Sequence, residues 1–190
     1  MSLVPAFDIG LVNGWLFMAI YPLQWLAVVV IPNNVAPRTG APVDAESDRR
    51  AQLMGTLNTL TWVIATLYSI FLPLQTGTPW FYVGLSLALI GIAIVIIATL
   101  DVARTPPGEP FTGITFRFSR HPMYLSMFFV YIGVTVAAAS WLFLLLTVLT
   151  FFLQRSQAIR EEGYCCATFG DTYRHYMART PRWLGTPKTA

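Results

Sequence analysis

The sequence predicts an all-helical, multi-pass membrane protein with about five transmembrane helices, the last two forming a short helical hairpin. Three observations predict this fold class. Charged residues make up only 11% of the 190 residues, against about a quarter in soluble proteins. Apolar residues make up 55% and gather in runs long enough to cross a bilayer. Lys and Arg lie at the ends of these runs and form no basic patch with interleaved aromatic residues, so no nucleic-acid partner is predicted.

The first three spans are each about 20 residues long, which is the length needed to cross roughly 30 Å of hydrocarbon. They are predicted at residues 11–31, 53–74 and 80–100. Pro22 inside the first run predicts a kink, which a membrane helix tolerates. Pro73 lies near the end of the second run, and Asp101 and Arg104 mark the end of the third.

The stretch between Arg120 and Arg155 contains no charged residue and has two possible interpretations. As one helix it would be about 50 Å long at 1.5 Å per residue, which is too long for the bilayer. Folded back on itself, it forms two spans of about 16 residues each, and all twelve Lys and Arg residues then lie on one side of the membrane. The positive-inside rule therefore favours a hairpin with its turn at residues 137–141, although this segment contains neither Gly nor Pro.

This topology places the N-terminus outside and the C-terminus in the cytosol, and the short, uncharged outer loops suit a bacterial cytoplasmic membrane. Residues 1–100 hold the three N-terminal spans and a cytosolic loop at 32–52, which is rich in Pro, Gly and charge and has Asp48 as a candidate helix cap. Residues 101–190 hold the hairpin, the cytosolic tail and almost all of the unusual polar residues. Nothing in the sequence indicates an oligomeric state.

A hairpin brings its two ends together, so Arg120 and His121 should lie beside Glu161 and Glu162. Pro122 suits the first turn of a helix, whose N-terminus attracts a carboxylate or a phosphate. Two carboxylates facing this helix end could hold an ammonium group or a pair of ribose hydroxyls. The combination suits a zwitterionic ligand, while headgroup anchoring and a solvated helix face are the alternative interpretations.

No metal site is predicted, because His121 and His175 form no ligand spacing with a cysteine or an aspartate. The adjacent Cys165 and Cys166 offer neither a disulfide framework nor a metal-ligand spacing. The chain also contains no Gly-rich phosphate loop and no pattern typical of a catalytic triad.

Residues 100–184 carry a joint pattern of short motifs at set intervals. In chain order these motifs are Arg120-His121-Pro122-Met123-Tyr124, Glu161-Glu162, Phe169-Gly170-Asp171-Thr172-Tyr173 and Tyr176. The pattern resembles the isoprenylcysteine carboxyl methyltransferase and phospholipid methyltransferase superfamily, small integral membrane enzymes that use S-adenosylmethionine. The first two spans carry no such signature.

The resemblance implies an enzyme that moves the methyl group of S-adenosylmethionine to a lipid-like or small hydrophobic acceptor. The implied cofactor-binding residues are Phe116, Arg120, His121, Pro122, Met123, Tyr124, Glu161 and Glu162. The candidates for contact with the acceptor are Phe128, Phe152, Arg155, Gln157 and Arg160. The region of Gly113 corresponds to the loop before the first motif, and no catalytic residue is assigned.

Two departures from the family pattern bear on the acceptor. The prenylcysteine enzymes carry a substrate-binding Arg four residues before the first Glu, where this chain has Gln157. Many members have Gly two residues after the motif Tyr, where this chain has Ser126. A prenylcysteine carboxylate is therefore not the expected acceptor. An NADPH-dependent enzyme of the sterol-reductase type and a non-catalytic membrane protein that keeps the scaffold remain alternative functions.

Overall fold

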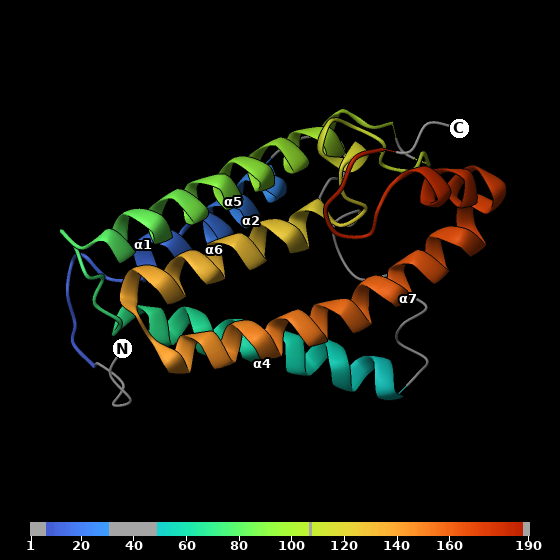
Figure 1. The fold of residues 1–190 in the computed structure, drawn as a ribbon. Helices are drawn as coiled ribbons and strands as arrows, with labels where there is room; N and C mark the ends of the chain where they lie inside the picture. The colour runs from blue at the N-terminus through green and yellow to red at the C-terminus, as the bar shows by residue number, and fades with distance from the viewer. Residues whose placement is uncertain (1–6, 31–48, 107, 188–190) are drawn as a thin grey trace.

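A computed structural model describes residues 7–30, 49–106 and 108–187, and within them all regular structure is helical (Figure 1). In chain order the helices are α1 (Trp15–Met18), α2 (Ile20–Val30), α4 (Arg49–Ile70), α5 (Pro79–Arg104), the 3₁₀ helix η2 (Thr115–Arg117), α6 (Pro122–Ala138) and α7 (Trp141–Arg179). By length and composition α4, α5 and α7 can each cross a membrane, and α6 and the α1–α2 pair are shorter apolar helices beside them. The predicted fold class, an all-α multi-pass membrane protein, is confirmed.

The helices form two groups, with α1, α2, α5 and α6 on one side and α4 and α7 on the other (Figure 1). The closest packing is between the antiparallel α5 and α6. A Cβ atom on Gly84 would lie 2.5 Å from the carbonyl oxygen of Gly133, and one on Gly133 would lie 2.7 Å from that of Gly84. The neighbouring Ala88 and Ala137 are fully buried. Small residues allow this approach, and close backbone packing holds helices together where lipid supplies no hydrophobic driving force.

The predicted first span, residues 11–31, is divided into α1 and α2 at Ala19. Pro22 accounts for the break, because its ring crowds the carbonyl of Met18 and it has no N–H to donate to that carbonyl. The helix α4 begins at Arg49, so the last residues of the predicted 32–52 loop are helical. Asp48 and the rest of that loop lie outside the described residues.

The helix α5 runs from Pro79 to Arg104, so Asp101 lies inside its last turn and is buried. The Asp101 carboxylate accepts hydrogen bonds from the backbone N–H of Thr115 at 2.8 Å and from its hydroxyl at 2.7 Å. Gly113 is required beside this contact, because a Cβ there would lie 2.4 Å from the carboxyl carbon of Asp101. The contact fastens the segment before α6 to the end of α5.

The predicted hairpin of α6 and α7 is confirmed, with its turn at the predicted place. Ala139 adopts the left-handed conformation (φ 49°, ψ 41°), and the Ser140 hydroxyl caps α7 by accepting a hydrogen bond from the backbone N–H of Phe143. The second arm is much longer than predicted. Its apolar part ends before Arg155, but the helix continues to Arg179, with a break at Gly170 (φ 56°, ψ −130°) that turns the chain back.

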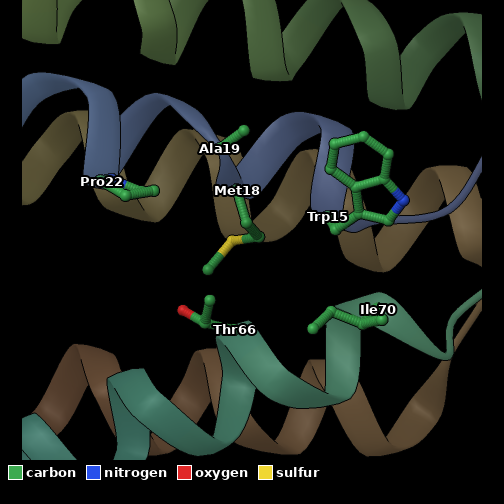
Figure 2. A pocket seen from close by; sticks show the side chains of 6 residues that line it. All are labelled: Trp15, Met18, Ala19, Pro22, Thr66 and Ile70. Atoms are coloured by element: carbon green, nitrogen blue, oxygen red, sulfur yellow. The ribbon is translucent and has the colours of Figure 1, made fainter.

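A cavity of about 350 Å³ lies between the α1–α2 pair and α4 (Figure 2). Its lining residues are Trp15, Met18, Ala19, Pro22, Thr66 and Ile70. The lining is apolar except for Thr66, whose buried hydroxyl has no hydrogen-bond partner among the described residues.

Candidate functional site

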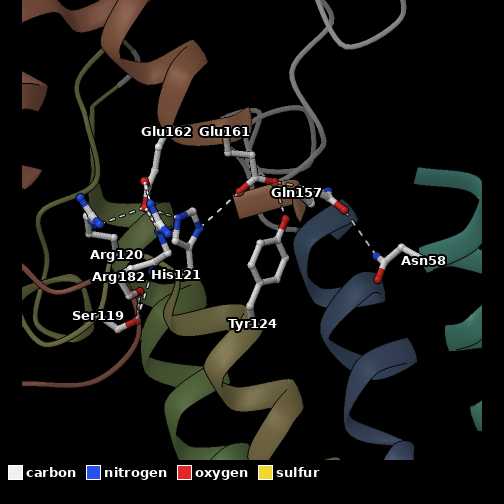
Figure 3. A network of polar contacts seen from close by, with 9 residues as sticks. All are labelled: Asn58, Ser119, Arg120, His121, Tyr124, Gln157, Glu161, Glu162 and Arg182. Carbon is white, nitrogen blue, oxygen red and sulfur yellow. Dashed lines mark hydrogen bonds and ion pairs between the residues drawn. The ribbon is translucent and has the colours of Figure 1, made fainter. Parts of the chain in front are cut away.

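A network of polar side chains lies where α6 begins and α7 leaves the apolar part of the bundle (Figure 3). His121 is at its centre. The Nε2 atom of His121 lies 3.2 Å from Oε1 of Glu162, and its Nδ1 atom lies 3.4 Å from Oε2 of Glu161. The hydroxyl of Tyr124 donates a hydrogen bond to Glu161. The hairpin thus brings together residues from its two ends.

Glu162 is the most heavily paired carboxylate of the network and is 4% exposed. Arg182 binds it with two hydrogen bonds, from Nε at 2.9 Å and from Nη2 at 2.7 Å. Nη2 of Arg120 lies 3.2 Å from Oε1 of the same carboxylate. Burial alone would raise the pKa of Glu162, but hydrogen bonds from His121 and Arg182 and the nearby positive charges lower it to about 2. Glu162 therefore carries a full negative charge near neutral pH.

His121 precedes α6 and is 8% exposed. Burial alone would lower the pKa of His121, but its hydrogen bonds to Glu161 and Glu162 outweigh this effect and raise the pKa above its ordinary value of 6.5. The protonated ring can donate to both carboxylates at once. The backbone N–H of His121 donates to the hydroxyl of Ser119 at 3.1 Å, which fixes the entry to the helix.

Glu161 differs from Glu162 in its partners and its exposure. Its side chain is 22% exposed, and besides His121 it is bound by two neutral groups, the Tyr124 hydroxyl and the Gln157 amide at 3.3 Å. The amide oxygen of Gln157 in turn accepts a hydrogen bond of 3.5 Å from Asn58 of α4. Glu161 is therefore the carboxylate of the pair that retains capacity for a ligand.

The chain after α7 returns across this network in a segment that we call the strap, residues 180–185. The carbonyl of Pro181 accepts a 3.0 Å hydrogen bond from the backbone N–H of Arg120, and the carbonyl of Arg182 accepts one of 3.2 Å from the Ser119 hydroxyl. The Trp183 ring lies 6.2 Å from the His121 ring. Sequence reasoning did not single out Ser119, Arg182 or Trp183 as site residues.

Some of the predicted cofactor residues lie apart from the network. Phe116 is 6% exposed and belongs to a hydrophobic cluster with Val102, against which Met123 and Tyr176 pack. The Tyr176 hydroxyl donates a 2.7 Å hydrogen bond to the Phe116 carbonyl, so the tail end of α7 is bound to η2. Pro122 is buried as the first residue of α6.

Of the residues predicted to contact the acceptor, some lie in or near the network and others lie apart from it. Gln157 belongs to the network, and Phe128 lies 5.3 Å from the Phe151 ring, which contacts the ring of Trp183 at 5.5 Å. Phe152 is 62% exposed on the outer surface of α7. Arg155 is exposed and Arg160 is half-buried.

Comparison of the chain with models of known protein families gives no match, and a search of curated proteins gives none either. The described residues also contain no group of three or more His, Cys, Asp and Glu side chains arranged to hold a metal ion. The function is therefore inferred from the chemistry of the site.

Proposed function

We propose that the protein is an integral membrane methyltransferase that moves the methyl group of S-adenosylmethionine to a lipid-like or small hydrophobic acceptor. The observation that supports this best is the pair Glu161 and Glu162 held against His121 and Tyr124 at the end of a membrane helix bundle. Within this pair the negative charge of Glu162 is paired with Arg120 and Arg182, while Glu161 remains partly exposed.

The side chains of the network fit a zwitterionic nucleoside. The carboxylate of Glu161 suits an ammonium group or ribose hydroxyls. The Nε atom of Arg120 is buried without a hydrogen-bond partner among the described residues, so it suits a carboxylate. The Tyr124 and His121 rings are stacked, with centroids 5.5 Å apart and planes 6° apart, and the Trp183 ring lies nearby; such rings favour a purine.

S-adenosylmethionine supplies an electrophilic methyl group on a sulfonium. The positive charge of the sulfonium disperses during methyl transfer, which favours a site poor in water. Much of the rate comes from positioning the two reactants. The chain's own contribution is to bind and orient, through Glu161 and Tyr124, and to exclude water beneath Trp183. His121 is paired with a carboxylate at each ring nitrogen, so it is not placed to act as a general base. An acceptor that is already anionic needs no base.

Binding of S-adenosylhomocysteine tests the proposal directly. We expect calorimetry on the purified protein to show binding of S-adenosylhomocysteine and none of NADPH. We expect Glu161→Gln to weaken that binding by about 1–3 kcal/mol, the usual cost of losing one partner of a buried hydrogen bond to a charged group. Asp171→Asn is the matched control, because Asp171 lies on the same helix with a side chain that is 80% exposed. Binding of NADPH alone would favour a reductase, and binding of neither would favour a non-catalytic scaffold.

The acceptor is expected to be apolar and to lack a carboxylate near the methyl position. Gln157 is neutral, and both ends of its amide are already hydrogen bonded, to Glu161 and to Asn58. The Phe128–Phe151 pair offers apolar surface beside Trp183, on the bilayer side of the network. We therefore expect low activity on a prenylcysteine carboxylate.

The assay offers prenylcysteine, phosphatidylethanolamine, and small hydrophobic thiols and amines with labelled S-adenosylmethionine. The expected result is methylation of one of the other acceptors well above prenylcysteine. Preferential methylation of prenylcysteine would show that Arg155 or Arg160 takes the place of the family's substrate Arg.

A further inference from the structure

We propose that the strap, residues 180–185, is a cover, held shut by Arg182 and Trp183, that must open before a ligand can reach the ring of His121. The cover itself is independent of the chemistry proposed above, and only its part in ligand entry rests on that function.

Most polar contacts of the strap are made with the segment before α6 and with Glu162, and its Trp183 ring contacts Phe151 of α7. Its backbone is bound through Pro181 and Arg182, and the N–H of Gly185 adds a 3.1 Å hydrogen bond to the carbonyl of Phe118. Its main side-chain contact is the double hydrogen bond from Arg182 to Glu162. These contacts position Trp183 beside the ring of His121.

Apart from Trp183, which contacts the rings of His121 and Phe151, the strap buries little apolar surface. It has no regular secondary structure, and beyond Thr180 none of its residues is fully buried. The side chain of Arg182 is 30% exposed and Leu184 is 64% exposed. Segments that are held by a few polar contacts with little buried apolar surface open at lower free energy than the core of a protein.

Opening the strap would not strand a buried charge, which would otherwise prevent the movement. When Arg182 leaves, Glu162 keeps the contacts of 3.2 Å with Arg120 and with His121. A buried carboxylate is costly only when it is left without a partner. Arg182, which is partly exposed, can regain water at its guanidinium. Glu162 is thus paired in both positions of the strap.

The two histidines of the chain provide a probe and an internal reference. His121 is 8% exposed and lies against Trp183, whereas His175 is exposed on α7. Diethyl pyrocarbonate acylates the neutral imidazole ring when the reagent can reach it. We expect His175 to react rapidly in the wild-type protein and His121 to react far more slowly.

We expect Arg182→Gln to speed the acylation of His121 about tenfold or more, because two hydrogen bonds to a charged group are lost. The rate at His175 should stay unchanged. Arg174→Gln is the matched control, since it removes an exposed ion pair, with Asp171, on the same tail. Removing a positive charge beside Glu162 makes protonation of His121 more favourable and so slows acylation. A faster reaction therefore reports access and not titration.

Hydrogen exchange distinguishes a cover from a general support of the fold. The amides of Arg120 and Gly185 form hydrogen bonds between the strap and the segment before α6. In Arg182→Gln these two amides should exchange faster, while those of α5 and α6 should not. An unchanged His121 rate, or faster exchange throughout α5 and α6, would overturn the cover.

The part of the cover in ligand entry is tested by measuring the association and dissociation rates of S-adenosylhomocysteine. A cover that gates entry makes association and dissociation faster together in Arg182→Gln, with a smaller change in Kd. Faster dissociation alone would mean that Arg182 binds the ligand, and would overturn the gating role. If the wild-type protein binds no S-adenosylhomocysteine, the proposed function fails, and the acylation and exchange results still decide whether the cover exists.

Discussion

Glu162→Gln is expected to destabilise the folded protein by about 3–5 kcal/mol, the usual cost of removing one partner from a buried ionic group. The substitution keeps the shape of the side chain but removes the negative charge that Arg120, His121 and Arg182 share. The side chains of Arg120 and His121 are only 10% and 7% exposed, so water cannot replace the lost carboxylate. Thermal unfolding in one detergent measures the loss.

Glu161→Gln serves as the matched control at the neighbouring position. Two of the partners of Glu161 are neutral and its side chain is more exposed, so its loss should cost clearly less. Equal losses for the two substitutions would contradict the unequal roles that we assign to the two carboxylates.

The stabilisation by Glu162 also has a predicted pH dependence. Its pKa is about 2 in the folded protein and 4.5 ordinarily, so the stabilisation is complete above about pH 4.5 and is lost as the pH falls through about 2. Glu162→Gln should lack this part of the acid loss. The pH dependence of the stabilisation by His121 has the opposite sign, because folding raises the pKa of His121. Its contribution to stability is complete below about pH 6.5 and is lost as the pH rises through the pKa of the folded protein.

The hairpin and the meeting of its ends were predictable because they depend on composition. A run without charge from Arg120 to Arg155 is too long for one span, and folding it in two places His121 beside Glu161 whatever the details of packing. Ser140 before Trp141 is a helix-start signal that would also have located the turn, and its hydroxyl does cap α7.

The strap and the extension of α7 were not predictable in the same way. The return of the chain depends on the positive φ of Gly170, and a lone Gly in a helical pattern does not specify whether the helix continues, bends or ends. Arg182 lies twenty residues after Glu162, with no periodic pattern to relate them. The pair Glu161 and Glu162 was predictable, but their different partners depend on where the strap returns.

The distribution of positive charge predicts an all-or-none difference in labelling across the membrane. Arg38 and Lys188 lie outside the described residues. The other Arg residues all lie at one end of the bundle: at the start of α4, at the end of α5, before α6, on α7 from Arg155 onward and in the strap (Figure 1). At the opposite end Asp8 is the single charge among the described residues. Basic residues are retained in the cytosol, so we propose that the Arg-rich end faces inward.

Two matched Thr→Cys variants test this orientation after Cys165 and Cys166 are replaced with Ser. Thr76 is exposed in the turn between α4 and α5, at the uncharged end, and Thr172 is exposed on α7 beyond Gly170. We expect a membrane-impermeant maleimide to label Thr76→Cys in intact cells and to label Thr172→Cys only after lysis. The reverse pattern would invert the topology. Labelling of both variants in intact cells would show that the two ends of the bundle share one side of the membrane, which antiparallel membrane-spanning helices do not allow.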